Sequence, residues 1–463
     1  MINRTTADTA LITGGTAING NGTYTGFATD SGKVKGNDLF ICIKGQRVDG
    51  HRFAPDAVRN GASAVLCDRR LDVNVPCVVV EDTVAAIQRL ASDYRKKTDV
   101  KVVGVTGSVG KTTTKEFIYS VLSASVKTHK TEGNKNSETG LPITVLGIDP
   151  DDKMCVAEMG MSGKGEISLL SRIALPDIAV ITNIGYSHID NLGSLENILD
   201  AKFEILDGLN PNGTLVLNGD DKMLFENKNR FGNVVTSGYK NKNVNVFASN
   251  ITNNGETISF DVSVSGINGI DDTSFHVVLN VAGGNHYVTD ALLAISVGLL
   301  SGLETDLIKK GLSAFEKTPG RNIIYDECGY TIIDDTYNAS PDPVCGALEG
   351  LSERKSSGNK IAVLGDMLEL GEYARKAHHD CGVQAAESGV DMLFAYGPFA
   401  AYYVEGAGEN VRSRLYDDKD QLAADLADIL EEGDAVIFKA SRGMKLEDVY
   451  NKVYEIMGLS EQE

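Results

Sequence analysis

A glycine-rich segment just after residue 105 carries the clearest chemical signal in the sequence. Residues 102–105 form a short β-branched run, residues 106–114 read TGSVGKTTT, and the next ten residues have the apolar spacing of a helix. A strand, a glycine turn and a helix together bind phosphate, because backbone N–H groups and the helix N-terminus point at the anion. The pattern predicts a nucleotide site built from Gly107, Ser108, Val109, Gly110, Lys111, Thr112 and Thr113.

Two side chains of this loop have the chemistry that phosphate transfer needs. Lys111 is suited to the β and γ phosphate oxygens, and the Thr112 hydroxyl is suited to Mg²⁺. One position differs from the common string G-x-x-x-x-G-K-[ST], since Val105 stands where its first glycine would be. A glycine-rich turn with an incidental lysine is the alternative interpretation.

An acidic and an imidazole side chain follow two further apolar runs. Glu158 comes after MCVA and His188 after IAVITNIGYS. Ligands gather at the carboxyl ends of parallel strands, and a carboxylate is a good Mg²⁺ ligand, whereas an imidazole is less usual. Alternatively, Glu158 is a solvated loop residue and His188 a capping residue.

Lys202 lies on the apolar face of a predicted helix. In SLENILDAKFEILDGL the apolar positions are Leu195, Ile198, Leu199 and Leu206, and Lys202 is seven residues after the first of them. One interpretation is snorkelling, in which the apolar stem is buried and the ammonium reaches water. The other is a desolvated amine of lowered pKa that reacts with carbon dioxide and becomes an anionic carbamate ligand.

The surrounding elements predict an α/β protein of three parts. At 463 residues the chain is too long for one ordinary core. Short strand-like and helix-like runs alternate along it, which favours mainly parallel sheets wrapped by helices. The polar run RKKTD and the run TPGR divide the chain into residues 1–98, 99–318 and 319–463.

Two of these parts have distinguishing patterns. Residues 244–282 alternate apolar and polar side chains, which predicts a small antiparallel β insertion in the central part. The third part has the strand spacing of a dinucleotide-binding-like sheet but no G-x-G-x-x-G string.

Composition excludes several classes of protein. A formal charge of -20 argues against coating nucleic acid or an anionic membrane. The longest nearly apolar stretch, residues 291–303, is shorter than the ~20 residues that cross a bilayer. We therefore expect a cytoplasmic protein with no membrane insertion, and free thiols at its seven scattered cysteines, Cys42, Cys67, Cys77, Cys155, Cys328, Cys345 and Cys381.

A resemblance to a known family runs through nearly the whole chain. The phosphate loop in the form T-G-x-x-G-K-T and six later segments look like the successive motifs of the Mur ligase family. These segments are GNKNSETGLPITVLGI (133–148), AEMGMSGKGEI (157–167), ITNIGYSHIDNLGSLENILDAKFEI (181–205), IIDDTYNASPD (332–342), AVLGDMLELGE (362–372) and KASRGMKLE (439–447).

The resemblance implies a fold and a set of cofactors. The fold would be a three-domain α/β architecture, with a central P-loop ATPase-like sheet, a small N-terminal domain and a C-terminal Rossmann-like domain. Lys111 would bind ATP, Thr112, Glu158 and His188 would serve two Mg²⁺ ions, and Lys202 would be carbamylated. The resemblance also assigns His286, Asp290, Arg321 and Asp335 to ATP binding.

The N-terminal region resembles a UDP-sugar-binding region. Residues 29–62 carry the similarity, and Gly32 stands where the family usually has Arg. The segment KGQRVDGH is also compatible with a simple tight turn. The substrate-binding candidates in this region are Ser31, Lys44, Gly45, Asp49, Gly50 and His51.

The C-terminal segment DDTYNASPD points to a dipeptide as the incoming amine. Relatives that select diaminopimelate carry a DNPR motif, which this sequence lacks. Asp334 and Asp335 could instead cap a helix. Asp290 replaces an Asn that helps relatives read adenine, and an ionised carboxylate cannot donate as an amide does. Further substrate-binding candidates are Asn136, Tyr337, Asn338 and Arg442.

The implied reaction joins D-Ala-D-Ala to UDP-MurNAc-tripeptide with ATP, through an acyl phosphate. We expect a monomer that has small-molecule substrates and no nucleic acid partner. A folate or cyanophycin-type amino acid ligase is one alternative, and the UDP-sugar-like region counts against it. A nucleotide-dependent switch is another, and a carbamate-forming lysine beside Glu158 and His188 counts against it.

Overall fold

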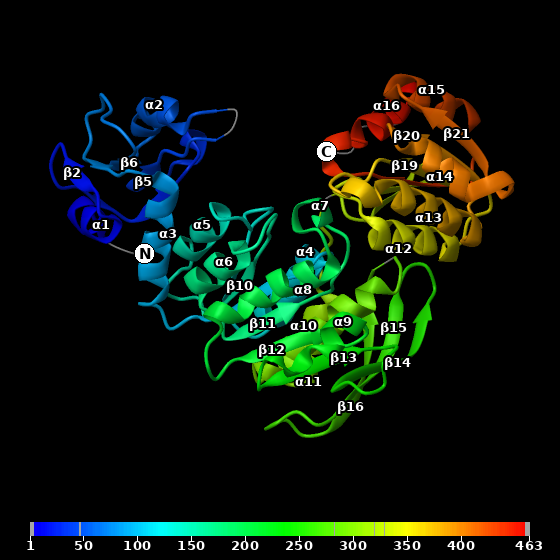
Figure 1. The fold of residues 1–463 in the computed structure, drawn as a ribbon, viewed down its shortest axis with the longest axis horizontal. Coiled ribbons are helices and arrows are strands. Elements are labelled where there is room, and N and C mark those ends of the chain that lie inside the picture. Colours follow the sequence, from blue (N-terminus) through cyan, green and yellow to red (C-terminus); the bar gives the residue numbers. More distant parts are fainter. Residues whose placement is uncertain (1–3, 46–47, 282, 319, 328, 459–463) are drawn as a thin grey trace.

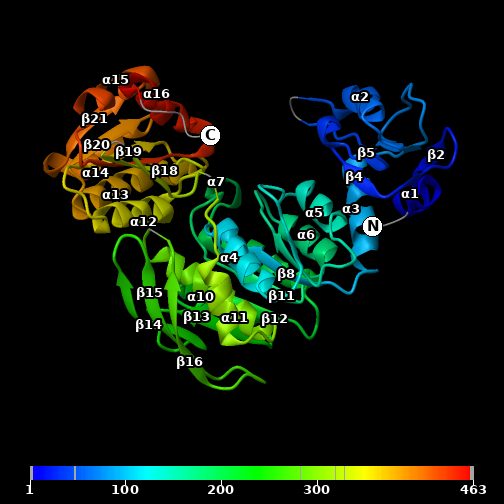
Figure 2. The same cartoon turned by 180° about the vertical axis from the view of Figure 1, so that it is seen from behind.

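The chain folds around three main β-sheets that follow one another along the sequence (Figure 1). The computed structural model describes residues 4–45, 48–281, 283–318, 320–327 and 329–458. Figures 1 and 2 both place the first and third sheets at opposite ends of the molecule, with the second between them. The predicted three-domain α/β fold class is confirmed, while the exact division at residues 98 and 318 stays a prediction.

The first sheet is a small α/β unit of five strands. Its order is β2-β7-β6-β5-β4, and only β2 runs antiparallel to its neighbour. β1 and β3 form a separate two-stranded ribbon. The elements are β1 (Arg4–Thr5), α1 (Thr6–Thr13), β2 (Thr16–Ile18), β3 (Thr23–Tyr24), β4 (Gly26–Ala28), β5 (Asp38–Ile41), α2 (Ala54–Arg59), β6 (Ala64–Cys67), β7 (Cys77–Val79) and α3 (Thr83–Arg95).

The second sheet has nine strands in the order β16-β15-β14-β13-β12-β11-β8-β10-β9. Its strands are β8 (Lys101–Thr106), β9 (Thr128–Lys130), β10 (Met154–Glu158), β11 (Ile178–Ile181), β12 (Thr214–Asn218), β13 (Val234–Gly238), β14 (Val246–Asn253), β15 (Ile258–Val264) and β16 (Thr273–Leu279). Its helices are α4 (Lys111–Ser123), α5 (Gly140–Leu146), α6 (Glu166–Ala174), α7 (Ile189–Leu192), α8 (Leu195–Phe203), α9 (Lys222–Glu226), α10 (His286–Leu300) and α11 (Thr305–Ser313).

The antiparallel strands predicted within residues 244–282 are not a separate insertion. β14 pairs in parallel with β13, and β15 and β16 then continue the same sheet as antiparallel strands. Phe260, Val262 and Val277 are buried with α10 in one core. The alternation in the sequence shows that one face is buried, but it cannot show which strand edge the segment joins.

The third sheet has six strands in the order β17-β18-β22-β19-β20-β21, parallel except for β17. Its strands are β17 (Ile323–Glu327), β18 (Tyr330–Asp335), β19 (Lys360–Gly365), β20 (Met392–Tyr396), β21 (Arg412–Tyr416) and β22 (Ala435–Lys439). Its helices are α12 (Pro341–Glu353), α13 (Ala374–Glu387), α14 (Ala400–Ala407), α15 (Lys419–Ile429) and α16 (Glu447–Met457).

Helix α3 connects the first sheet with the second. The Tyr94 hydroxyl donates to the Ile148 carbonyl at 2.6 Å, and Arg95 Nε donates to the Ala174 carbonyl at 2.6 Å. Buried side chains of both parts form one continuous apolar cluster around this helix. The first part is therefore attached to the central part by buried contacts as well as by the chain itself.

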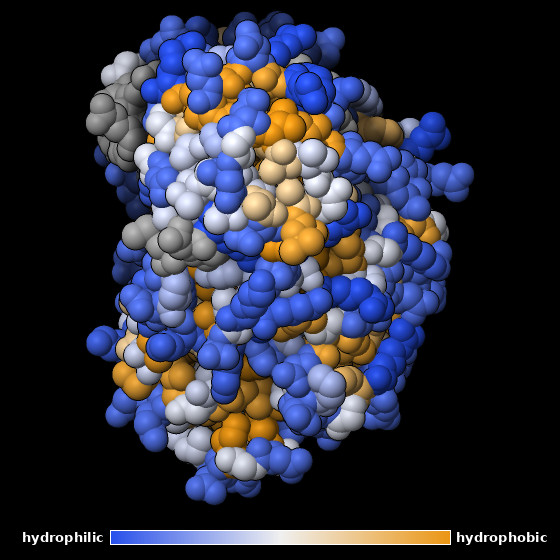
Figure 3. All heavy atoms as spheres, turned by 90° about the vertical axis from the view of Figure 1, so that its left-hand side faces the viewer, coloured by the Kyte–Doolittle hydropathy of each residue, from blue (hydrophilic) through white to orange (hydrophobic). Residues whose placement is uncertain are grey.

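Polar side chains cover much of the outer surface. Figure 3 shows the side of the molecule nearest the first sheet, where hydrophilic residues predominate and apolar patches lie between them. Among the described residues, no helix is long and apolar enough to span a bilayer. The six cysteines that the structure describes are free thiols, and Cys328 lies outside the described residues.

Candidate active site

Three neighbouring strands of the central sheet end at one place. β8 lies between β11 and β10, and all three are parallel. The phosphate loop follows β8, Glu158 is the last residue of β10, and the segment to His188 follows β11. The residues predicted from separate motifs are thus brought together, because carboxyl ends of adjacent parallel strands share one edge.

The phosphate loop is held in shape by the segment after β11. The backbone N–H groups of Ser108 and Val109 donate to the carbonyl and side-chain oxygens of Asn183, at 3.0 and 2.8 Å. The Thr182 hydroxyl donates to the Val109 carbonyl at 2.5 Å, and Ser108 Oγ contacts the backbone of Gly185. These bonds fix the shape of the loop, so the amides that follow it at the start of α4 are held in place for an anion.

Two features fit this loop to phosphate. Gly110 has φ +79° and is the N-cap of the 13-residue helix α4, so the free N–H groups of the helix begin here. Lys111 Nζ folds back onto the loop, donating to the carbonyls of Gly107 at 2.8 Å and Ser108 at 3.1 Å. Burial lowers the pKa of Lys111, and Arg321 lowers it further, while Glu158 raises it.

Glu158 is a buried carboxylate, only 1% exposed, so it is not a solvated loop residue. Its Oε1 accepts from Asn136 Nδ2 at 2.7 Å, and its Oε2 lies 3.6 Å from Lys115 Nζ. Oε2 has no hydrogen-bond partner among the described residues. A buried anionic oxygen that borders a cavity and lacks a donor is suited to a cation.

His188 lies at the start of α7 with φ +63°, and its side chain does not cap that helix. Its Nδ1 is 2.7 Å from Glu369 Oε2, which belongs to the third part of the chain. Burial lowers the pKa of His188, Glu369 raises it, and the ammonium groups of Lys111 and Lys202 lower it. These three cationic positions therefore lie close enough to influence one another.

Lys202 is 1% exposed, so its ammonium does not reach water and the snorkelling interpretation is wrong. Burial lowers its pKa well below the usual range, Lys111 lowers it further, and Glu166 and Glu204 raise it. A neutral amine is the form that reacts with carbon dioxide. The environment therefore fits the carbamate hypothesis, although Lys202 does not itself line the cavity described next.

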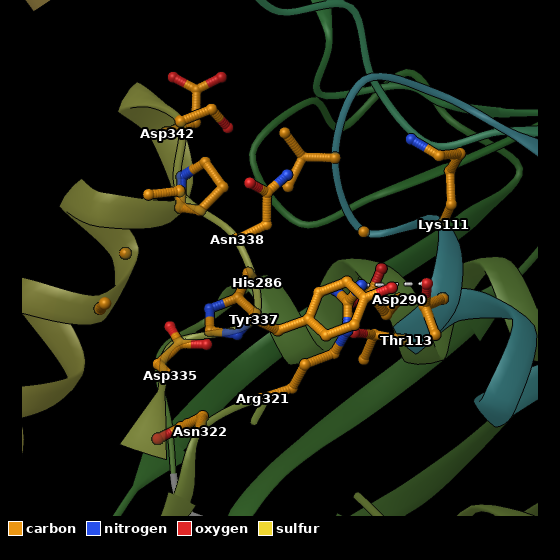
Figure 4. A pocket seen from close by; sticks show the side chains of 18 of the residues that line it. Lys111, Thr113, His286, Asp290, Arg321, Asn322, Asp335, Tyr337, Asn338 and Asp342 are labelled. Carbon is orange, nitrogen blue, oxygen red and sulfur yellow. Dashed lines mark hydrogen bonds between the residues drawn. The ribbon is translucent and has the colours of Figure 1, made fainter. Parts of the chain in front are cut away.

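A cavity of about 530 Å³ lies between the central and third parts of the chain (Figure 4). It is bordered by the phosphate loop, by the strand ends of the central sheet, and by the start of α12 from the third part. The predicted residues that line it are Ser108, Val109, Gly110, Lys111, Thr112, Thr113, Asn136, Glu158, His188, His286, Asp290, Arg321, Asp335, Tyr337 and Asn338.

Arg321 connects the two sides of this cavity. Its guanidinium donates to Thr112 Oγ1 at 3.2 Å, and its central carbon lies 4.1 Å from the centre of the Tyr337 ring. Figure 4 shows the Tyr337 ring beside Arg321 in the middle of the pocket. A guanidinium that contacts both the phosphate loop and the 335–338 segment is placed to form hydrogen bonds with a polyphosphate in this cavity.

Asp335 is paired rather than used as a cap. Asp335 and Lys439 are neighbours on the parallel strands β18 and β22, and Lys439 Nζ donates to its carboxylate and to the Asn338 carbonyl. Asp334 accepts from Thr336, and the N-cap of α12 is Ser340. The helix-cap interpretation of this acidic pair is therefore wrong.

Asp290 lies under the phosphate loop, where it accepts a hydrogen bond from Thr114 Oγ1. Burial raises the pKa of Asp290 to about 7, so near neutral pH a large fraction of this carboxyl carries a proton and can donate. Burial also lowers the pKa of His286 to about 4, which leaves the imidazole neutral.

The remaining predicted residues do not line the cavity. In the first part, the Asp49 carboxylate contacts His51 Nδ1 at 2.6 Å and Arg69 at 2.6 Å, and the Asp68 backbone N–H donates to His51 Nε2. These contacts hold the turn between β5 and α2. Arg442 forms an ion pair with Glu447 at 2.9 Å. The residues outside the cavity are Ser31, Lys44, Gly45, Asp49, Gly50, His51, Gly107, Lys202 and Arg442.

Sequence reasoning missed several residues that shape the site. Lys115 is 1% exposed and donates to the Thr131 carbonyl at 2.9 Å while facing Glu158. Its position one helical turn after Lys111 was the available signal. Asp342 and Lys439, which also line the cavity, lie within the quoted motifs, but a string of letters does not show which side chains face inwards.

The fold and site define a P-loop protein whose phosphate loop borders a cavity between two α/β units. Models of three Mur ligase domains match the chain: "Mur ligase family, catalytic domain" at residues 23–144, "Mur ligase middle domain" at 105–298 and "Mur ligase, glutamate ligase domain" at 320–442.

Individual relatives cover almost the entire chain. It is 40% identical to the UDP-N-acetylmuramoyl-tripeptide--D-alanyl-D-alanine ligase of Bacillus subtilis, over 98% of this chain and 99% of that protein. The enzyme of the same name from Escherichia coli is 30% identical, over 92% and 93%. The chain belongs to the Mur ligase family.

Solved structures agree with this assignment. A MurF crystal structure from Acinetobacter baumannii has a TM-score of 0.88 at 28% identity, covering 98% of this chain and 99% of that one. MurF from Thermotoga maritima in complex with ADP has a TM-score of 0.81 at 31% identity, covering 94% and 98%. The second neighbour holds a nucleotide in the fold described above.

Proposed function

We propose that this chain is an ATP-dependent ligase that joins D-alanyl-D-alanine to UDP-N-acetylmuramoyl-tripeptide during peptidoglycan precursor synthesis. The relatives that cover almost its full length are named for this reaction. The single observation that carries the proposal is the cavity, in which a phosphate loop faces the DDTYNASPD segment of another sheet. A cytoplasmic monomer is the form that we propose.

The three parts have separate tasks in this proposal. Residues 1–98 hold the UDP-sugar, residues 99–318 hold ATP, and residues 319–463 contribute contacts to the nucleotide and the dipeptide. In the first part, Lys44 and Asp49 form an isolated antiparallel bridge, residues 46 and 47 lie outside the described residues, and Val48 is 53% exposed. Asp49 contacts His51 and Arg69, so we assign Asp49 and His51 to shaping the UDP-sugar site.

Two Mg²⁺ ions and a carbamate fit the residues around the phosphate loop. Thr112, Glu158, His188 and the carbamate of Lys202 would hold the ions, and the bound ions would supply charge neutralisation for the transferring phosphoryl group. The Oε2 of Glu158, which accepts no hydrogen bond among the described residues, supports this assignment. The described part of the chain has no group of three His, Cys, Asp or Glu side chains that could hold a metal ion. The proposed ligands include only two side chains of these types, Glu158 and His188.

Each residue at the phosphate loop has a separate role in the proposed reaction. The loop amides and Lys111 would bind and orient the β and γ phosphates, and Arg321 would stabilise negative charge that develops during transfer. The γ-phosphoryl group passes to the terminal carboxylate of the tripeptide, which makes an acyl phosphate. The amine of D-Ala-D-Ala then displaces phosphate, and enclosure between the two α/β units keeps water away from the intermediate.

One assay tests the proposal. Phosphate release is measured with ATP, Mg²⁺ and UDP-MurNAc-tripeptide, with and without D-Ala-D-Ala, and the pentapeptide product is identified by mass spectrometry. We expect release to require the dipeptide and to fall by ~10²-fold or more in Lys111→Ala. Lys101→Ala, at an exposed strand end, is the matched control. Equal turnover with meso-diaminopimelate and a UDP-muramoyl-dipeptide would reject this function.

A further inference from the structure

The acyl-transfer step needs a group that takes a proton from the incoming amine. An α-amino group has a pKa of ~7.7–8.0, so near pH 7 most of it is ammonium and cannot attack. The candidates are the carboxylates that border the cavity, since its lysines and its two arginines are cationic, His188 is assigned to a metal ion and His286 is assigned to ATP binding. These carboxylates are Glu158, Glu166, Asp290, Asp335, Asp342 and Glu353.

Five of these six carboxylates already accept hydrogen bonds. Glu158 accepts from Asn136 and Asp290 from Thr114, as described above. Glu166 accepts from the Ser162 backbone N–H at 2.9 Å. Asp335 is paired with Lys439, and Glu353 accepts from Asn253 at 2.6 Å. Asp342 alone accepts no hydrogen bond and forms no ion pair within the described residues.

Asp342 is also in the right place. It is the second residue of α12, and its Oδ2 lies 3.2 Å from the position that a Cβ on Gly185 would occupy. The backbone of Gly185 is hydrogen-bonded to Ser108 Oγ of the phosphate loop. Because Asp342 lies beside Gly185, its carboxylate comes close to the phosphate loop from the third part of the chain. Figure 4 shows Asp342 and Lys111 on opposite sides of the pocket, with Asn338 between them.

Few charged groups surround this carboxylate. Asp342 is solvent-exposed, but the protein atoms around its carboxyl partly desolvate it and raise its pKa, and the nearby Asp221 at the start of α9 raises it further. The thiols of Cys345 in α12 and Cys381 in α13 are the other titratable groups that sense it. A carboxylate with an anionic neighbour and no cationic partner is a better proton acceptor than one held in an ion pair.

We propose that Asp342 is the general base for the attacking amine. This inference rests on the proposed function. The ammonium of the dipeptide gives one proton to the Asp342 carboxylate, and its nitrogen lone pair then forms the C–N bond to the acyl carbon. The C–O bond to phosphate breaks as the tetrahedral intermediate collapses, and the departing phosphate takes the second proton. Asp342 finally returns its proton to solvent.

The test separates the two half-reactions in the variant Asp342→Asn. Hydroxylamine is largely uncharged at neutral pH and traps acyl phosphates as hydroxamates without needing a base. With ATP, Mg²⁺ and UDP-MurNAc-tripeptide, the variant should form hydroxamate within about threefold of the wild-type rate. With D-Ala-D-Ala its kcat should fall by ~10²–10⁴-fold, the range for loss of a general base.

The pH profile distinguishes a base from a residue that only binds the dipeptide. The kcat defect of Asp342→Asn should shrink between pH 7 and 9, as more of the amine becomes free. Glu349→Gln, at an exposed position of the same helix, is the control and should behave as wild type. A defect confined to the KM of the dipeptide, or an equal loss of hydroxamate formation, overturns the proposal. If wild type itself forms no hydroxamate, the proposed function fails instead.

Discussion

At the scale of single residues, the site depends on charged groups that are removed from water. Lys115, Glu158 and Lys202 are each 1% exposed. Such groups are stable only when paired, neutralised or bound to an ion, because burial disfavours an isolated charge. Lys115 is paired with Glu158. The pKa of Lys202 is lowered, which favours the neutral amine, the form that can be carbamylated.

The carbamate hypothesis predicts chemical rescue at Lys202. Lys202→Ala should lose most ligase activity and regain part of it with formate or acetate, which can fill the vacated anionic position. Lys202→Arg should be inactive without rescue, because guanidinium stays charged and occupies the space. Lys164→Ala, at an exposed position, is the control. ¹³C NMR with labelled bicarbonate should show a carbamate signal in wild type, and full activity in Lys202→Arg would contradict the hypothesis.

Asp290 predicts a pH dependence of stability. Its folded pKa is raised to about 7, whereas an unfolded Asp titrates near ~3.9. Its contribution to stability is therefore fully present below pH ~4 and is lost as the pH rises through about 7. The upper limit of this loss is about 4 kcal/mol. Asp290→Asn should remove the effect, so the variant should lose less stability than wild type between pH 5 and pH 8.

Denaturant midpoints at the two pH values measure this difference. Asp306→Asn is the control, because the side chain of Asp306 is 87% exposed. If Asp290→Asn and wild type lose the same stability between pH 5 and pH 8, the carboxyl is not protonated in the folded protein.

At the scale of elements, the phosphate loop depends on glycine at one crowded position. Gly107 has φ +148°, and a Cβ there would lie 1.9 Å from Thr182 Oγ1. That hydroxyl holds the Val109 carbonyl, so any shift of Thr182 moves the loop itself. The loop and the segment after β11 therefore act as one unit.

Gly107→Ala should displace the loop without unfolding the sheet. A misplacement of ~1 Å at a reaction centre can cost ~10²-fold in rate, and we expect a loss of that order in phosphate release. Gly232→Ala, where a Cβ would meet nothing within 4 Å, is the matched control. Wild-type turnover in Gly107→Ala would show that the loop tolerates the shift.

At the scale of the whole molecule, the two substrate regions are separate. The UDP-sugar candidates Ser31 and Lys44 belong to the first part, whereas the cavity lies between the other two parts. If the first part holds the UDP-sugar, as we propose, both ends of the molecule must contact one substrate during the reaction. Small-angle X-ray scattering should therefore show a smaller radius of gyration when UDP-MurNAc-tripeptide and a non-hydrolysable ATP analogue are both bound. An unchanged radius of gyration with both ligands bound would contradict the prediction that the first part moves towards the cavity.

The sequence by itself determined the local features. The strand, glycine turn and helix around Lys111 could be predicted because turn geometry and helix spacing depend on near neighbours in the chain. The apolar face that carries Lys202 and the alternation in residues 244–282 are readable for the same reason. The family motifs then pointed to Glu158 and His188 as partners of the loop.

The tertiary structure decided which residues meet and how deeply they are buried. The order of strands places β8 between β10 and β11, so Asn183 joins the site from a segment that no local pattern connects to it, and Lys115 of α4 comes to face Glu158. The same packing joins β14 to the central sheet and leaves Asp342 unpaired in the cavity. Strand order and the environment of a carboxyl depend on contacts between distant segments, and periodicity along the chain carries no information about those contacts.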